Sequence, residues 1–300
     1  MVLFQLPFQV SIILAAVVVS TPTIAITTSY DYTAKDSRGH IIKLSKAPLK
    51  IISLCPGTTE MIYAIGLGNR LIADTTYCDY PENAKQLPKI GDVTTSIEKV
   101  IALNTDLIIA SYSANHTAVD LLEKHQQKVF CVDSNSLEEV AADMVTLGKL
   151  SGTEGTANAS AEKMRKRLAQ LKSSLKQARS NPKALVIVQF DPLLVVGPNN
   201  FMDDLIRRAG ATNLGIMTGK AWGGMSPEQV IVVKPEIIIA GKNSHDRIVH
   251  RPGWENIPAV KNRRIYDSPG DAAVRPGPRL VAALETLIRQ IHPEVKIPPP

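Results

Sequence analysis

Two stretches of the sequence, SIEKVIALNTDLIIA at residues 96–110 and SPEQVIVVKPEIIIA at residues 226–240, form an internal repeat that decides the fold. Aligned without a gap, they share Ser, Glu, Val, Ile, Ile, Ile and Ala at equivalent positions. In each copy the serine can cap a short helix, and the apolar run that follows predicts a buried strand. Pro227 takes the first helical position of the second copy, where its missing N–H leaves no bond unmade. The chain therefore contains two copies of one βα architecture.

Strand and helix signals also alternate around the first copy. A helix is predicted to follow the apolar run at residues 51–54. Thr58 or Thr59 would cap it, and Glu60 would lie in its first turn, where a carboxylate suits the helix dipole. Such alternation predicts a parallel sheet that is covered on both faces. Strands are predicted for the apolar runs 41–44, 51–54, 71–73 and 129–132.

A helical stretch separates the two copies. Helix formers dominate from residue 137 to residue 179, and Asn181-Pro182 ends the pattern. The βα alternation resumes at residues 184–188 and continues to a last helix predicted over 278–291. We therefore predict an α/β protein with an N-terminal lobe at 45–136, a linking helical segment at 137–180 and a C-terminal lobe at 183–295.

The composition is that of a soluble globular chain. Its 300 residues are 44% hydrophobic and 21% charged, which excludes a disordered chain and a multi-span membrane protein. Part of the net charge of +6 lies in a run of Lys and Arg between Lys163 and Arg179. No aromatic residue interrupts that run, so it indicates a solvated helix face, and no nucleic-acid partner is expected.

Residues 1–25 have the features of a signal peptide. Residues 11–19 form an apolar run that is short for a bilayer span, which needs about 20 residues. Small residues at Thr23 and Ala25 suit cleavage after Ala25, so we expect an exported protein. The segment before the run has no Lys or Arg, which leaves an uncleaved membrane anchor facing outside as the alternative. No cysteine follows the run, and a lipid anchor is not expected.

Only three cysteines are present, Cys55, Cys78 and Cys131. An odd number leaves at least one thiol free, and the sequence permits one disulfide without fixing its pairing. Their spacing does not predict a zinc site.

Ligand sites in parallel α/β sheets lie at the carboxyl ends of the strands. Two such edges facing each other would form a cleft. Its lining would be largely aromatic and neutral, which suits a large ligand of mixed polarity better than a small anion. The candidate ligand-binding residues are Pro56, Gly57, Tyr77 and Tyr112 in the first lobe, and Phe190, Trp222 and Asp271 in the second.

The two tryptophans receive different interpretations. Trp222 is predicted to lie in a glycine-rich loop just before the second repeat copy, an unfavourable place for a core residue, so ligand contact is favoured over packing. Trp254 is assigned to packing. Tyr80, which precedes Pro81, is interpreted as structural.

Catalytic motifs are absent from the sequence. It has no nucleophile elbow, no phosphate-binding loop and no His-Glu-x-x-His pattern, so no catalytic residue and no enzyme activity are predicted. The six histidines are scattered, and neither His116 nor the pair His245 and His250 predicts a metal site.

Glu98 and Glu228 occupy equivalent positions in the two repeat copies. Each would stabilise its helix through the dipole by about 0.3–1 kcal/mol. Two carboxylates at matching places on two lobes would equally suit a pseudo-symmetric partner with two basic pockets. The residues alone do not separate these two interpretations.

The chain resembles the cobalamin-binding periplasmic proteins of ABC importers, within the helical-backbone class that also serves haem and ferric siderophores. The stretches that carry the resemblance are IISLCPGTTE at 51–60, YCDYP at 77–81, residues 98–110 and residues 222–240. The resemblance implies a class III periplasmic binding protein, with two Rossmann-like lobes bridged by one long helix. It also implies a periplasmic monomer that transports cobalamin as its ligand and needs no cofactor.

The same resemblance assigns roles to residues. It makes Glu98 and Glu228 the pair that docks on the ABC permease, Tyr77 and Trp222 the corrin contacts, and Asp271 an acidic residue near the ligand. The stretch 93–95, Val-Thr-Thr, lacks an aromatic residue that cobalamin binders can carry. Another corrinoid, haem and a siderophore therefore stay open as ligands. A tetrapyrrole metal chelatase is the enzyme alternative, but it would be cytoplasmic with a cluster of His or acidic residues.

Overall fold

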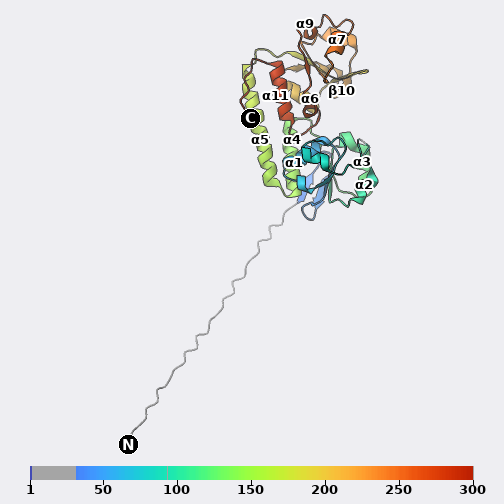
Figure 1. Ribbon diagram of the computed structural model, residues 1–300, viewed down its shortest axis with the longest axis vertical. Helices are drawn as coiled ribbons and strands as arrows, with labels where there is room; N and C mark the ends of the chain where they lie inside the picture. Colours follow the sequence, from blue (N-terminus) through green and yellow to red (C-terminus); the bar gives the residue numbers. More distant parts are fainter. Residues whose placement is uncertain (2–31, 93, 300) are drawn as a thin grey trace. The chain divides into compact units, whose positions relative to one another are not determined.

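The computed structural model describes residues 1, 32–92 and 94–299 (Figure 1). The predicted signal peptide at 1–25 falls almost entirely outside this range. No helix of the described residues is long and apolar enough to cross a membrane.

A four-stranded parallel sheet forms the centre of the N-terminal lobe, in the order β4-β3-β5-β6. Neighbouring residues of each strand point to opposite faces, so Leu107 and Ile109 enter one core while Ile108 and Ala110 enter another. Helix α1 covers the first face, and α2 and α3 cover the second. The strands are β3 (Ile51–Ser53), β4 (Leu71–Ala73), β5 (Leu107–Ala110) and β6 (Val129–Cys131); the helices are α1 (Pro56–Ala64), α2 (Ile97–Ala102) and α3 (Tyr112–Lys124).

Helix α1 begins earlier than the threonine cap that the sequence predicts. Pro56 takes the first helical position after Cys55. Thr58 lies inside the helix and its hydroxyl donates to the Cys55 carbonyl. Glu60 is therefore not a first-turn residue; it is buried and pairs with an arginine of the other lobe.

Antiparallel strands β1 (Tyr32–Lys35) and β2 (Ile41–Leu44) form a separate hairpin, and β1 packs against α4 (Leu137–Ser151). The linking segment divides into two helices, α4 and α5 (Glu154–Ser174). The break lies at Gly152, whose φ of +75° ends α4 in the left-handed conformation that favours glycine. Helix α5, with 21 residues, is the long helix of the fold.

The sheet of the C-terminal lobe is mixed, in the order β10-β8-β7-β11-β12 with β9 paired to β7. Strands β7, β9, β11 and β12 are parallel, as expected, but β8 pairs antiparallel with both of its neighbours, β7 and β10. Only Asp191 and Pro192 connect β7 to β8, and so short a connection can join only antiparallel neighbours. The strands are β7 (Lys183–Phe190), β8 (Leu193–Val196), β9 (Thr212–Asn213), β10 (Trp222–Gly224), β11 (Ile237–Ala240) and β12 (Ile265–Asp267).

The remaining helices lie in or beside this lobe (Figure 1). They are α6 (Phe201–Arg208), α7 (Pro227–Val233), α8 (His245–Val249), α9 (Pro258–Lys261), α10 (Asp271–Val274) and α11 (Leu280–Ile291). Short 3-10 helices are η1 (Gly68–Arg70), η2 (Glu82–Gln86), η3 (Leu175–Gln177) and η4 (Leu214–Thr218).

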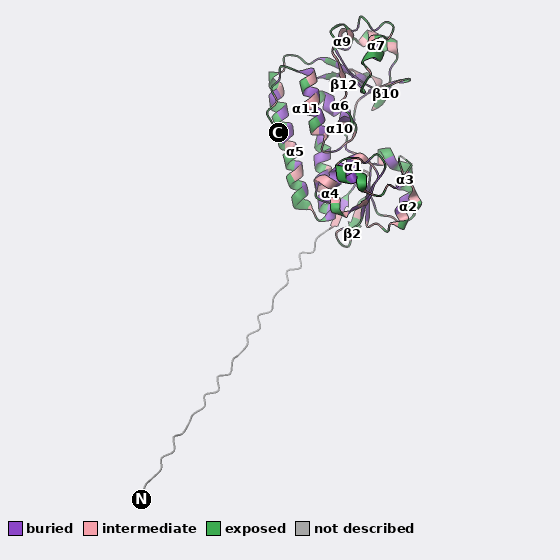
Figure 2. Ribbon diagram, in the orientation of Figure 1, coloured by how far each residue is buried: buried purple, intermediate pink, exposed green. Residues whose placement is uncertain are grey.

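The repeat predicted from the sequence is confirmed. Ser96 caps α2 and Ser226 caps α7, and each helix leads into a fully buried strand, β5 or β11. One continuous core joins the inner faces of both sheets through α4, α5, α6 and α11 (Figure 2). The lobes therefore share buried apolar surface through these helices, and this surface holds them together more firmly than a flexible linker would.

Candidate functional site

The amino end of α1 lies against the C-terminal lobe. A Cβ atom at Gly57 would come within 2.5 Å of the carbonyl oxygen of Pro276, so a side chain there would push the backbones apart. Pro56 occupies the first helical position beside it. Gly57, predicted as a ligand residue, is thus placed in a contact between the two lobes.

Arg275 connects three elements near this contact. Its guanidinium binds Asp79, in the loop after β4, and donates to Asp271 Oδ2 at 2.9 Å. The side chain of Arg275 is only 12% exposed. Its hydrogen bond to Asp79 holds the pKa of that carboxyl below its ordinary value. The predicted ligand residue Asp271 is therefore tied to the Tyr77–Pro81 loop of the other lobe.

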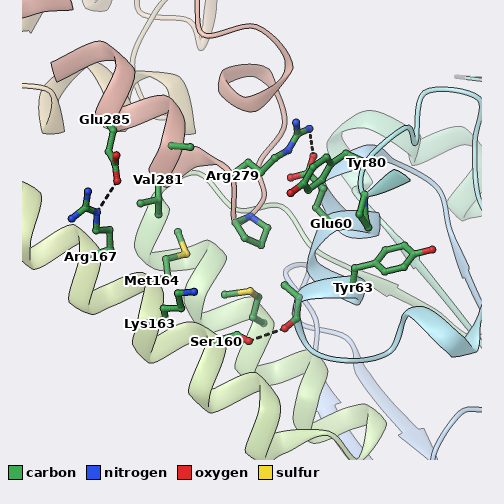
Figure 3. A pocket seen from close by; sticks show the side chains of 15 residues that line it. Glu60, Tyr63, Tyr80, Ser160, Lys163, Met164, Arg167, Arg279, Val281 and Glu285 are labelled. Atoms are coloured by element: carbon green, nitrogen blue, oxygen red, sulfur yellow. Dashed lines mark hydrogen bonds and ion pairs between the residues drawn. The ribbon is translucent and has the colours of Figure 1, made fainter. Parts of the chain in front are cut away.

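A second arginine, Arg279, makes a parallel connection. Its Nη2 lies 2.5 Å from Glu60 Oε1, and its guanidinium lies 4.1 Å from the ring centre of Tyr80 (Figure 3). Burial raises the pKa of Glu60, while Arg279 acts in the opposite direction. We call Arg275, Arg279, Asp79 and Glu60 together the interlobe clamp.

Sequence reasoning missed the interlobe clamp. Arg275 and Asp79 are 196 residues apart, and Arg279 and Glu60 are 219 residues apart. No local pattern connects them; the one hint is that the two arginines lie four residues apart in the sequence. Tyr80, interpreted as structural, packs on this clamp.

Two of the predicted aromatic ligand residues are exposed. Tyr77 is 53% exposed, and its hydroxyl has no hydrogen-bond partner among the described residues. Trp222 is 44% exposed and contacts Phe201 edge-on, with ring centres 6.3 Å apart. Trp222 begins strand β10, so it is held by a strand and not by the loop that the sequence predicts. Large exposed aromatic side chains on strand and loop ends are suited to stacking on a ligand.

Phe190 lies at the end of β7 and is covered by Arg247, whose guanidinium is 4.7 Å from the ring centre. Arg247 in turn binds Asp191. Phe190 pairs with Leu193 and Trp222 pairs with Val196, at opposite ends of β8. At the usual rise per residue this separates the two aromatic positions by about 10 Å along the strand.

Tyr112 is placed differently from the other predicted ligand residues. Its ring lies under the guanidinium of Arg38 at 5.3 Å and meets His116 edge-on at 6.4 Å. These contacts all belong to the N-terminal lobe. No described contact joins Tyr112 to Tyr77, Trp222 or Asp271.

All three cysteines are free. Cys78 and Cys131 are buried, and burial raises the pKa of their thiols to about 11 and about 12. The disulfide that the sequence permits does not form. The described residues hold no group of three or more His, Cys, Asp or Glu side chains that could bind a metal ion.

Glu98 and Glu228 are both exposed, each in the first turn of its helix and in a different lobe. The Ser226 hydroxyl lowers the pKa of Glu228 through a hydrogen bond. Trp254 is fully buried and donates to the Pro227 carbonyl at 3.3 Å, which anchors the start of α7 and confirms its assignment to packing. Each glutamate is thus presented to solvent by a capped helix.

Known proteins are similar to this chain in sequence and in fold. A family model described as periplasmic binding protein matches residues 51–272. An uncharacterised ABC transporter substrate-binding lipoprotein of Bacillus subtilis is 30% identical over 274 residues, covering 88% of this chain and 87% of the relative. The vitamin B12-binding protein of Photorhabdus laumondii is 30% identical over 251 residues, covering 83% and 90%.

A solved structure agrees with these sequence matches. The periplasmic vitamin B12-binding protein of Vibrio cholerae superposes with a TM-score of 0.76 at 25% identity, over 82% of this chain and 97% of that one. The match over most of the sequence and the two-lobed α/β fold with its long helix show that the chain belongs to the periplasmic binding protein family, in its class III fold.

Proposed function

We propose that this protein captures cobalamin or a related corrinoid between its lobes and delivers it to the permease of an ABC importer. Relatives named vitamin B12-binding protein, at 30–31% identity over more than four fifths of the chain, support this ligand. The charges around the candidate ligand residues also favour a neutral ligand.

The observation that carries the proposal is that the arginines beside the candidate ligand residues are already paired. Arg275 binds Asp79 and Asp271, and Arg247 binds Asp191. These arginines therefore contribute no unneutralised cation, while Tyr77 and Trp222 offer exposed aromatic surface. Haem carries two propionates, and many ferric siderophores are anionic, so each would favour free cations. A corrinoid carries neutral amides around a large apolar ring and suits this lining better.

Haem is the second candidate because of Tyr77. Tyrosine can be an axial ligand of haem iron, and the Tyr77 hydroxyl is exposed without a partner among the described residues. Replacement of Tyr77 by Phe separates the two ligands: it removes an iron ligand but keeps the ring that would stack on a corrin.

Calorimetric titration of the purified protein with cyanocobalamin, with haemin in parallel, tests the proposal. We expect saturable one-to-one binding of cobalamin, weakened about tenfold by Trp222→Ala and little changed by Tyr77→Phe; one stacked ring is worth about 1–3 kcal/mol. Binding of haemin that Tyr77→Phe abolishes would replace the corrinoid by haem. Binding of neither ligand would refute both assignments.

Delivery would use the two exposed glutamates. We propose that Glu98 of the N-terminal lobe and Glu228 of the C-terminal lobe each enter a basic pocket of the permease. Capped helices hold both carboxylates at the surface, with Ser96 and Ser226 as the caps. The protein would act in the periplasm, to which its N-terminal segment would direct it. No bond of the ligand would be made or broken.

A further inference from the structure

A cavity of about 560 Å³ lies among α1, α4, α5 and α11 (Figure 3). None of the seven predicted ligand residues lines it. Its wall is mainly apolar, with Met144, Met164 and Val281 from three different helices and Ala64 at the end of α1. Methionine side chains adapt to ligands of varied shape, so this wall suits a flexible apolar group.

The charged residues of the wall do not balance. Glu60 pairs with Arg279 at 2.5 Å, and Arg167 pairs with Glu285 at 2.6 Å. Lys163 also lines the cavity, and it has no hydrogen bond or ion pair within the part of the chain that the structure describes. Its side chain lies beside Met164 on α5 (Figure 3). The wall is left with one unpaired positive charge beside an apolar surface.

The wall also contains polar atoms that the protein does not satisfy. Glu60 Oε2 and Arg279 Nε are buried without a hydrogen-bond partner. Glu60 as a whole is only 3% exposed. Buried polar atoms in a folded protein nearly always have a partner, often a water molecule, so the end of the cavity at Glu60 is polar and an acyl chain would lie against the methionines instead.

We propose that this cavity is a second binding site, for a small amphipathic carboxylate. The acyl chain would contact Met144, Met164 and Val281, and the carboxylate would pair with Lys163. The site is separate from the candidate residues of the corrinoid cleft. It goes beyond the proposed function and does not depend on it.

Calorimetric titration of the full chain with sodium decanoate at low ionic strength tests the proposal, with decanol as a neutral probe of the same chain length. We expect saturable one-to-one binding of decanoate that is tighter than binding of decanol. Lys163→Gln should weaken decanoate about fivefold, the upper range for an exposed ion pair, and should leave decanol unchanged. Lys166→Gln, on the same helix but outside the cavity, is the matched control.

A second variant tests the location without disturbing the core. Ala282 is exposed and lines the cavity, so Ala282→Phe should occupy its mouth and weaken both probes at least tenfold. Ala169→Phe, at an exposed position of α5 outside the cavity, should not. Absence of saturable binding, or binding that both Lys163→Gln and Ala282→Phe leave unchanged, would overturn the proposal. Thermal unfolding of each variant verifies that it is folded.

Discussion

The guanidinium of Arg275, in the C-terminal lobe, binds the carboxylate of Asp79, in the loop after β4 of the N-terminal lobe. The same guanidinium binds Asp271, the first residue of α10, at 2.9 Å. One side chain thus connects a predicted ligand residue to the loop that carries Tyr77. Arg279, four residues later, makes a second connection to the N-terminal lobe, through Glu60.

Replacement of Arg275 by Gln should weaken ligand binding. It removes the cation between Asp79 and Asp271, so the two carboxylates repel each other and the Tyr77 loop loses its tie to the other lobe. We expect the Kd for cobalamin to rise about tenfold, equivalent to about 1.4 kcal/mol, in calorimetric titration. Arg289→Gln, which removes an exposed guanidinium that lies 3.4 Å from Glu285, is the control and should leave the Kd unchanged. An unaltered Kd in Arg275→Gln would show that the clamp does not organise the site.

The Glu60–Arg279 pair should stabilise the contact between the lobes. Glu60→Gln alone leaves the guanidinium, whose side chain is 24% exposed, without its carboxylate, and should lower the free energy of unfolding by about 2–3 kcal/mol. Arg279→Gln should act similarly, and the double variant should lose less than the sum, with a coupling of about 1–2 kcal/mol in urea unfolding. The exposed pair Lys85–Glu82 should show a coupling below about 0.5 kcal/mol. Strict additivity at Glu60 and Arg279 would contradict the clamp.

Asp143 should make stability depend on pH. Burial raises the pKa of Asp143 to about 6. The Ser134 hydroxyl donates to this carboxylate at 2.6 Å and lowers the pKa, but its effect is smaller than that of burial. The folded state therefore holds this proton more tightly than the unfolded state does, and stability should fall as pH rises from about 4 to about 6. Asp143→Asn should raise the Tm at pH 7.5, and its advantage should disappear near pH 4. Asp267→Asn, at an exposed position, should show no such pattern. An equal Tm difference at both pH values would exclude titration of Asp143 as the cause.

The double variant Glu98→Ala, Glu228→Ala should separate binding from transport. Both side chains are exposed on short capped helices, so we expect unchanged cobalamin affinity and folding. ATP-dependent uptake into vesicles that hold the permease should fall to background, because both basic pockets lose their partner. Glu162→Ala with Glu255→Ala removes two exposed carboxylates elsewhere and should transport normally. Normal uptake by the first double variant would refute the docking assignment.

The sequence by itself determined the repeated unit of the fold. Ser96 and Ser226 cap their helices because a serine hydroxyl can accept from the backbone within the first turn, which is a local property. The strand at Ile237–Ala240 is buried on both faces, as its unbroken apolar run predicts.

How the lobes meet, and which side chains lie between them, depends on the tertiary structure. The pairings of Arg275 with Asp79 and Arg279 with Glu60 join residues about 200 positions apart, and Gly57 fits because of the Pro276 backbone. Trp222 is held on a strand because β8 reverses and pairs with it. Propensity, capping and periodicity act over a few residues, whereas an ion pair, a close backbone contact and a cavity depend on where distant segments pack.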